Sequence, residues 1–425
     1  MAKAMPFRFA RGVFLITSFV VALLPLFVLM SPVYITVFVH SARFIRLRRA
    51  YTDILSGVYL DFAAAMLTSP VTGTKVHLYS DEPTKFFQDR GVLLLSNHRC
   101  RVDWMFSGFV WCNAILSNGA LRFILKDSIR GVPIFGWIMT AFMYIFLTRK
   151  NRELDVNHIQ KMVRYLISSG DRPSLMIFPE GTDLTDESLG KSQEYSEKHG
   201  FPKLKYVLCP KISGVETVLD RLRGHGAAVH DMTLAYKDYR MGEAGDTRPS
   251  EAGMWSGEFP EEVHIAINRF EADELPTDRT VLERWVLGSF VQKEKLLKGF
   301  YENGSVIPTK DIIDAAAKRL KDKSSDNEED DKLLASSEPW PKEIEIPVRK
   351  FKPLIIMFLW VLGLLLGLIH FSWMRWYFLI ITIYCLVIRM LFKGFDLVEL
   401  QLHASIIDRM EAEYTNVGET NKKTD

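Results

Sequence analysis

An apolar run in the chain ends at a histidine, and an aspartate follows five residues later. The stretch GVLLLSNHRCRVDW, which begins at Gly91, reads as a buried strand that turns polar at Asn97 and His98. If His98 ends this strand and Asp103 lies in the first turns of a following helix, the carboxylate can accept the imidazole N–H and stabilise the imidazolium. The pair therefore predicts a general base at the end of a strand.

This base has no partner nucleophile in a known sequence motif. No G-x-S-x-G elbow occurs, so a hydroxyl group of a substrate is the expected source of the proton. Cys100 and Ser96 lie nearby in the sequence and leave a covalent acyl-enzyme open as an alternative. A structural histidine is the alternative for the pair taken alone. The four cysteines are far apart and form no CxxC pair, so neither a disulfide framework nor a structural zinc site is expected.

A second strand end carries polar residues of another kind. LMIFPEGTDLT begins at Leu175 and predicts a buried strand that ends in a proline-glycine turn, with Glu180 and Gly181 at its tip. Strand ends of this kind gather at one edge of an open α/β sheet, where ligands bind. Gly181 would let backbone N–H groups approach a ligand, and Glu180 could order the loop. An ordinary turn is the alternative interpretation.

Apolar runs and charge divide the first three quarters of the chain into three regions. Gly12–Val39 contains no charged residue, so residues 1–50 are expected to hold an N-terminal transmembrane anchor, with a cleaved signal peptide as the alternative. Short apolar runs alternate with helical stretches over residues 51–305, which predicts an α/β domain. A polar, acidic stretch predicts a solvated linker over residues 306–348.

A second strongly apolar region begins at Pro353. The runs Pro353–Trp373 and Trp376–Ile388 flank Arg375, and basic residues lie outside both ends. This pattern predicts a transmembrane hairpin over residues 349–395, with Arg375 at its turn and both ends facing the cytosol.

Residues 396–425 are expected to form a cytosolic tail. The tail ends in a lysine pair, Lys422 and Lys423, that has the form of a dilysine retrieval signal. The signal predicts a retrieval coat as a partner and a multi-pass location in the endoplasmic reticulum membrane. Lysine and arginine total 53 against 51 acidic residues, so there is no basic excess and no nucleic acid partner is expected.

Four short signatures occur in a recognisable order. They are N-H-x4-D at Asn97, His98 and Asp103, YIFLTR ending at Arg149, FPEGT at Phe178–Thr182, and YVLCP ending at Pro210. In this order they resemble the signatures of the membrane glycerolipid acyltransferases, the family that contains the lysophosphatidic acid (1-acylglycerol-3-phosphate) acyltransferases. Longer stretches, such as NHRCRVDWMF and FPEGTDLT, resemble the lysocardiolipin acyltransferase branch of that family.

The resemblance implies a fold and a reaction. The fold is a glycerol-phosphate acyltransferase-like mixed α/β sheet flanked by helices, with N-terminal and C-terminal transmembrane helices. In such enzymes the residue matching His98 deprotonates the hydroxyl of a lysophospholipid, which attacks the thioester of acyl-CoA, and the residue matching Asp103 orients the histidine. Arg149, Glu180 and Gly181 match residues that bind the acceptor phosphate. The bilayer holds the lipid acceptor, acyl-CoA is a co-substrate, and no metal or prosthetic group is implied.

One position departs from many lysophosphatidic acid acyltransferases, which carry arginine directly after E-G-T. Here the residue is Asp183, which would repel a phosphate monoester that an arginine would bind. We therefore expect a phosphodiester acceptor such as lysocardiolipin, lysophosphatidylinositol or lysophosphatidylglycerol. The alternatives are a lysophosphatidic acid acyltransferase that makes phosphatidic acid, a CoA-independent transacylase, and a non-catalytic hairpin protein that shapes or tethers membranes.

Overall fold

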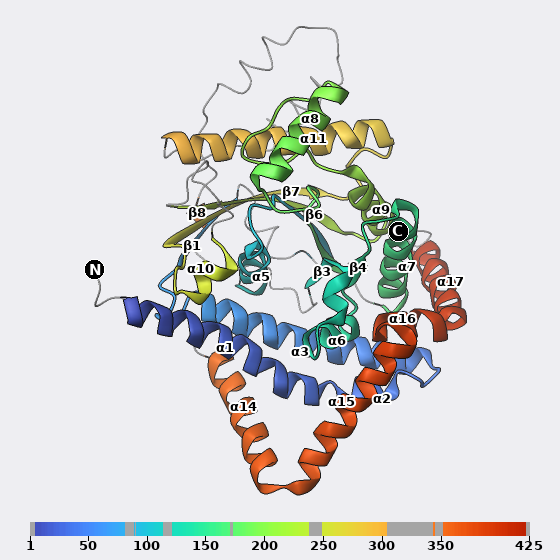
Figure 1. Ribbon diagram of the computed structural model, residues 1–425. Coiled ribbons are helices and arrows are strands. Elements are labelled where there is room, and N and C mark those ends of the chain that lie inside the picture. The colour runs from blue at the N-terminus through green and yellow to red at the C-terminus, as the bar shows by residue number, and fades with distance from the viewer. Residues whose placement is uncertain are drawn as a thin grey trace. The chain divides into compact units, whose positions relative to one another are not determined.

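The chain folds as two compact units, and Figure 1 shows the elements of both. The computed structural model describes residues 5–80, 89, 91–113, 121–170, 173–237, 249–303, 343–344 and 352–421. Unit 1 comprises Met1–Ile16, Ala63–Ser117 and Met176–Lys350, and unit 2 comprises Thr17–Phe62, Asn118–Leu175 and Phe351–Asp425. Almost all of the linker expected over residues 306–348 lies outside the described residues, as do Lys422 and Lys423.

Unit 1 is built on a mixed sheet. Its strands are β1 (Lys75–Tyr79), β2 (Val92–Ser96), the second half of β5 (Ser174–Ile177), β6 (Ala228–Tyr236), β7 (Glu262–Glu271) and β8 (Glu343–Ile344). They lie in the order β5-β2-β6-β7-β1-β8. β2 runs parallel to β6 and β1 runs parallel to β7, whereas β6 and β8 are antiparallel to β7 and β1 respectively. The mixed α/β sheet expected from the sequence is therefore confirmed.

Helices flank both faces of this sheet. They are α5 (Asp103–Asn113), α8 (Asp186–His199), α9 (Ile212–Leu222), α10 (Glu251–Trp255) and α11 (Arg279–Lys298), which continues into a π-helical turn, η3 (Gly299–Asn303). Side chains alternate between the two faces of a strand. On β6, Asp231 contacts Lys293 of α11, and Tyr236 contacts Phe106 of α5. α11 and α5 thus lie on opposite sides of the sheet, as Figure 1 also shows.

Unit 2 combines a pair of parallel strands with helices. The strands are β3 (Leu121–Lys126) and β4 (Ile145–Leu147). The helices are α2 (Ser31–Thr36), η2 (Asp127–Gly131), α6 (Phe135–Ala141), α7 (Arg152–Ser168), α14 (Lys352–His370), α15 (Ser372–Phe392), α16 (Phe395–Leu402) and α17 (Ala404–Asn421). α1 (Met5–Leu29) and α3 (Ala42–Leu67) each run from one unit into the other.

Three of the described helices are long and apolar enough to cross a membrane. They are the Arg8–Leu29 part of α1, and α14 and α15 in full. α14 and α15 form the predicted hairpin, drawn in orange in Figure 1. Arg375 lies in the first turn of α15 and donates to the carbonyls of Leu368 and Ile369 at the end of α14. These bonds satisfy carbonyls that the end of a helix leaves open, so Arg375 closes the turn between the two helices.

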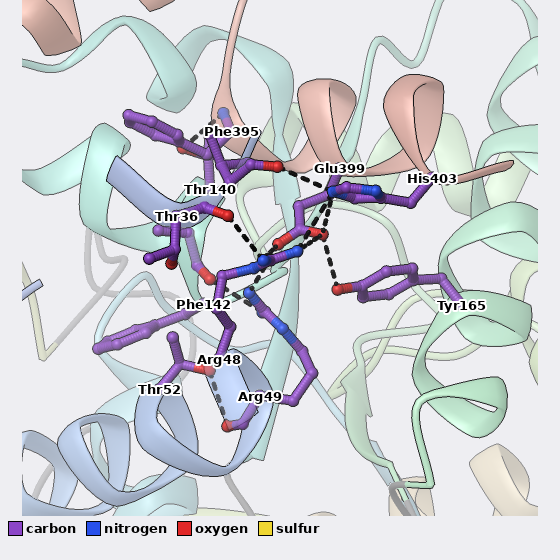
Figure 2. A network of polar contacts seen from close by, with 12 residues as sticks. Thr36, Arg48, Arg49, Thr52, Thr140, Phe142, Tyr165, Phe395, Glu399 and His403 are labelled. Atoms are coloured by element: carbon purple, nitrogen blue, oxygen red, sulfur yellow. Dashed lines mark hydrogen bonds and ion pairs between the residues drawn. The ribbon is translucent and has the colours of Figure 1, made fainter. Parts of the chain in front are cut away.

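The segment that follows the hairpin is tied into unit 2 by a buried carboxylate. Glu399 of α16 accepts from Arg48 Nε at 2.7 Å and Nη2 at 3.0 Å, and from the Tyr165 hydroxyl at 3.0 Å. Arg49 Nη2 lies 3.5 Å from the same group, and His403 Nε2 contacts the carbonyl of Val37 at 2.8 Å. Figure 2 shows these side chains converging from α3, α7 and α16. The segment expected as a tail therefore begins with an anchored helix.

This network gives a structural role to two basic residues that follow the first apolar segment. Arg48 and Arg49 follow that segment and count as positive charge beside the membrane in a sequence pattern. In the structure both are almost fully buried and paired with Glu399. α3 follows the first apolar segment and α16 follows the hairpin, so the ion pair joins the chain after one apolar region to the chain after the other.

Removing the charge of Glu399 should strongly destabilise the protein. Glu399→Gln leaves two buried guanidinium groups without a counter-charge, and breaking a buried pair in this way costs about 3–5 kcal/mol. The measurement is urea-induced unfolding of the full-length protein in detergent micelles. Asp408→Asn is the matched control, because Asp408 pairs with Arg164 at an exposed position where the loss is about 1 kcal/mol or less. Equal stability of the two variants would contradict the anchoring role.

Candidate active site

Asn97 fixes the point at which the chain leaves β2. Its amide nitrogen donates to the carbonyl of Leu234 at 3.0 Å, and its amide oxygen accepts from the N–H of Leu234 at 2.8 Å. The side chain thus extends the pairing of β2 with β6 by imitating a backbone amide. Because Asn97 is buried and both of its polar groups are bonded, the next residue, His98, starts from a defined position.

The His98 ring is held by contacts on two sides. Its Nδ1 lies 3.0 Å from Oδ2 of Asp103, the first residue of α5. One face of the ring stacks on Phe178, with the ring centroids 4.1 Å apart and the planes at 20°. The Asp103 side chain is completely buried, whereas 19% of the His98 side chain is exposed. The approach of these two residues predicted from the sequence is therefore observed.

Asp103 accepts hydrogen bonds from four donors. Besides His98, the N–H of Cys100 lies 2.9 Å from Oδ2, and the Tyr236 hydroxyl and the Cys100 Sγ lie 2.7 Å and 3.1 Å from Oδ1. Because each of these groups is a donor, Asp103 acts as an acceptor at both of its oxygens. His98 Nδ1 must then carry the proton, so Nε2 is the basic nitrogen of the ring. The same saturation leaves Asp103 without an open lone pair for a metal ion.

Glu180 supports the backbone of His98. One carboxylate oxygen accepts from the N–H of His98 at 2.7 Å and the other from the N–H of Leu208 at 2.9 Å. Glu180 is 2% exposed. Burial raises the pKa of Glu180, and the two N–H donors oppose this shift by stabilising the carboxylate. The geometry therefore gives Glu180 a positioning role, which matches the expectation that it orders the loop.

Gly181 lies in the turn that follows, beside a lysine. Its φ is +76°, a left-handed conformation that glycine adopts at little cost. A Cβ built on Gly181 would lie 3.3 Å from Lys211 Nζ, and the N–H of Lys211 donates to the carbonyl of Pro179 at 2.8 Å. The N–H of Gly181 donates to the carbonyl of Phe178 at 3.0 Å, so the positive group beside this turn is the Lys211 ammonium.

Arg149 belongs to unit 2. It follows β4 with a φ of +60°, which is uncommon for a residue with a side chain. Its N–H donates to Oδ2 of Asp155 at 2.7 Å, and the N–H of Thr148 donates to Oδ1 at 2.8 Å. The carboxylate in the first turn of α7 thus holds the backbone at Arg149 in this conformation.

The structure brings His98, Asp103, Glu180 and Gly181 together in unit 1.

The structure disfavours the covalent acyl-enzyme that the sequence left open, because both candidate nucleophiles are buried. Cys100 is completely buried, and its thiol donates to Asp103. Burial, reinforced by the neighbouring carboxylate, raises the pKa of the Cys100 thiol, so the reactive thiolate is disfavoured. Ser96 is also fully buried and donates to the carbonyl of Asn97 at 3.0 Å. Neither group is arranged to attack a substrate.

Sequence reasoning missed three residues of the site: Phe178, Lys211 and Tyr236. Phe178 stands inside the FPEGT signature but was given no role. Tyr236 ends the apolar stretch AVHDMTLAY, and this position is the signal that could have found it. β6 is parallel to β2, and the ends of parallel strands meet at one edge of a sheet. Tyr236 at the end of β6 and His98 just after the end of β2 therefore lie at the same edge of the sheet.

A histidine paired with a buried aspartate at the edge of a mixed sheet, in a chain with three helices apolar enough to cross a membrane, is typical of a membrane-associated α/β enzyme. Family models agree with this class: the one described as Acyltransferase matches residues 75–210, and the one described as Acyltransferase C-terminus matches residues 253–360. Lysocardiolipin acyltransferase 1 of Mus musculus is 31% identical over 79% of this chain and 83% of its own length. The chain belongs to the glycerolipid acyltransferase family.

Two further proteins show the breadth of the similarity. The 1-acyl-sn-glycerol-3-phosphate acyltransferase epsilon of Mus musculus is 27% identical over 61% of this chain and 70% of its own length. The crystal structure of the 1-acyl-sn-glycerophosphate acyltransferase PlsC from Thermotoga maritima aligns with a TM-score of 0.39 at 16% identity, over 75% of this chain and 100% of that chain. The similar proteins thus carry names with different acceptors.

Tyr236→Phe should reduce turnover without unfolding the protein. The change removes one donor from the buried Asp103 carboxylate, and a hydrogen bond to a charged group contributes about 1.5–3 kcal/mol. We expect kcat for acyl transfer to fall about 10-fold to 100-fold, with unchanged circular dichroism. Tyr206→Phe is the matched control, because the Tyr206 hydroxyl donates to Glu302 at 2.7 Å and has no contact with Asp103. Equal kcat in the two variants would show that Tyr236 does not support the base.

Proposed function

We propose that the protein is an acyl-CoA-dependent acyltransferase that acylates the free hydroxyl group of a lysophospholipid. The observation that supports this most directly is the contact of His98 Nδ1 with the buried, four-donor carboxylate of Asp103, which leaves Nε2 as a base. Membership of the acyltransferase family supplies the reaction class. The absence of a usable thiol or serine beside His98 favours direct transfer to the substrate hydroxyl.

In the proposed reaction, His98 Nε2 takes the proton of the lipid hydroxyl while that oxygen attacks the thioester carbonyl carbon of acyl-CoA. A C–O bond forms, and the tetrahedral intermediate collapses with cleavage of the C–S bond. The leaving CoA sulfur receives the proton from the imidazolium, so His98 is restored. Asp103 stabilises the imidazolium in between, because its carboxylate faces Nδ1.

The acceptor phosphate needs cations and N–H donors near His98. Within unit 1, the ammonium of Lys211 beside the left-handed Gly181 turn offers a cation, whereas the N–H of Gly181 donates to the carbonyl of Phe178 at 3.0 Å. The resemblance adds Arg149 as a further cation. It also assigns Glu180 to the phosphate, but both oxygens of Glu180 hold backbone N–H groups. We therefore propose that Glu180 acts on the acceptor only by positioning His98 and the turn.

The charge of Asp183 influences which phosphate headgroup the site accepts. Its Oδ2 lies 3.6 Å from Nε of Arg101, whose side chain is 69% exposed. Arg101 offsets part of the negative charge of Asp183 but leaves no net positive charge at this point. We infer that the site prefers a phosphodiester acceptor, such as lysocardiolipin, lysophosphatidylinositol or lysophosphatidylglycerol, over the doubly charged monoester of lysophosphatidic acid.

We also propose a location in the endoplasmic reticulum membrane. Three apolar helices support a membrane protein whose acceptor lies in the bilayer. Lys422 and Lys423 stand where a retrieval coat reads a dilysine signal. Their replacement by serine, followed by imaging of the tagged protein, tests the address separately from the enzymatic activity.

His98→Ala should abolish acyl transfer. General-base catalysis contributes about 10²-fold to 10⁴-fold in rate, so kcat should fall within or beyond that range while the protein stays membrane-bound. The assay supplies acyl-CoA as the sole acyl donor, with lysocardiolipin as acceptor in detergent micelles. His199→Ala is the control, because His199 is exposed and bonds only its own helix. Activity retained by His98→Ala would refute the assigned base, and wild-type activity only with a phospholipid donor would indicate a transacylase.

Asp183→Arg should shift the acceptor preference toward lysophosphatidic acid. A guanidinium at this position can make a charge-assisted contact with a phosphate monoester, so the ratio of kcat/KM for lysophosphatidic acid to that for lysocardiolipin should rise about tenfold or more. Asp220→Arg on the exposed side of α9 makes the same charge change elsewhere. A ratio that is the same in Asp183→Arg, Asp220→Arg and wild type would remove Asp183 from the selection of the acceptor.

A further inference from the structure

Two histidines and a glutamate meet at the far end of the sheet in unit 1. His77 on β1 and His264 on β7 are direct neighbours in the parallel register, and Glu262 lies two residues before His264 on the same face of β7. The two imidazole rings stack with centroids 4.7 Å apart at an angle of 10°. Each of the three residues offers one ligand atom, and these atoms lie within 4.8 Å of one another.

The Nδ1 atom of each histidine already has a neighbour. His77 Nδ1 lies 2.6 Å from Oε1 of Glu343 on β8, and His264 Nδ1 lies 2.9 Å from the Tyr79 hydroxyl. Histidines that bind metals donate their second ring N–H to such oxygens, which fixes the tautomer and directs the other nitrogen at the ion. The Nε2 atom of His77 is buried and has no hydrogen-bond partner among the residues that the structure describes. A buried polar atom in this state calls for an explanation.

The glutamate presents a separate oxygen to the same point. Oε1 of Glu262 pairs with Lys237 Nζ at 2.8 Å, whereas Oε2 lies 3.6 Å from Nε2 of His264. The lysine therefore occupies one oxygen of the carboxylate, and the other oxygen faces His264.

The cluster lies on the face of the sheet opposite to the His98 site. In the antiparallel register His264 pairs with Ala235 of β6, and Tyr236 pairs with Val263. Since neighbouring strands share the direction of paired side chains, His264 points with Ala235 to the face of α11 and Tyr236 points to the face of α5. The His264 ring accordingly contacts Phe300 after α11 at 5.0 Å.

We propose that His77 and His264 through Nε2, and Glu262 through Oε2, bind one divalent transition metal ion, with Zn²⁺ as the first choice. Two imidazoles and one carboxylate are a zinc ligand set that leaves one tetrahedral position to water. Tetrahedral zinc needs ligand atoms about 3.4 Å apart, which rotation of the three side chains can supply. The bound ion joins β1 to β7, and Glu343 links β8 to it through His77.

The test measures metal binding directly on the full-length protein. The protein is purified in detergent through a tag without histidine, stripped with a chelator, and titrated with Zn²⁺ or Co²⁺ alone. We expect one equivalent of zinc per chain by elemental analysis, and a visible absorption band typical of tetrahedral Co²⁺. A stripped wild-type protein that takes up no zinc and shows no Co²⁺ band at micromolar metal would overturn the proposal without any variant.

Variants assign the ligands. His77→Ala, His264→Ala and Glu262→Gln should each weaken zinc affinity more than about 100-fold, and Glu343→Gln, which changes only the partner of His77, about 10-fold. The control is again His199→Ala, which should bind as wild type, and circular dichroism establishes that each variant is folded. Unchanged zinc affinity in folded His77→Ala and His264→Ala would place the ion elsewhere and refute this site.

Discussion

The buried carboxylate of Asp103 is the interaction on which the site depends. A charge at this depth would be costly without partners, and it is tolerated because His98, Cys100 and Tyr236 supply four donors. These donors come from the end of β2, the turn before α5 and the end of β6. One carboxylate thus fixes the separation of two strands and a helix, and at the same time sets the tautomer of the histidine. Glu180 repeats the device at the next strand end, since its two oxygens hold the backbone of His98 and Leu208.

How far the sequence predicts this arrangement depends on the distance between partners. His98 and Asp103 are five residues apart, so local pattern and helix geometry suffice for their contact. The hairpin of α14 and α15 follows from hydropathy alone. Tyr236, in contrast, lies 133 residues from Asp103, and its role appears only once β2 and β6 are known to pair. Glu399 lies 351 residues from Arg48. In the sequence it is an ordinary acidic residue of a helix, and nothing local indicates that it is buried.

The Glu399 network also explains why composition describes the membrane segments better than the compact units. Apolar runs identify consecutive regions of the chain, whereas each unit is assembled from three separate segments. Unit 2 joins the residues after the first apolar segment to those after the hairpin through Arg48 and Glu399 (Figure 2). A sequence pattern assigns the charges of Arg48 and Arg49 to the membrane surface, but in the structure both residues pair with Glu399 in the interior. The buried pair thus links the chain after the first apolar region to the chain after the hairpin, which a count of basic residues does not show.

The two faces of the sheet in unit 1 are connected through the turn that ends α11. The Tyr301 hydroxyl accepts a hydrogen bond from the N–H of Tyr236 at 3.2 Å, and Arg99 lies over the Tyr301 ring at 5.1 Å. The preceding residue, Phe300, contacts His264. π-Helical turns such as η3 recur at functional positions because they displace side chains from the regular helix register. In this turn two consecutive aromatic residues have different neighbours: Phe300 contacts the histidine cluster, and Tyr301 contacts the strand end at Tyr236. The end of α11 therefore contacts both the histidine cluster and the strand whose last residue donates to Asp103.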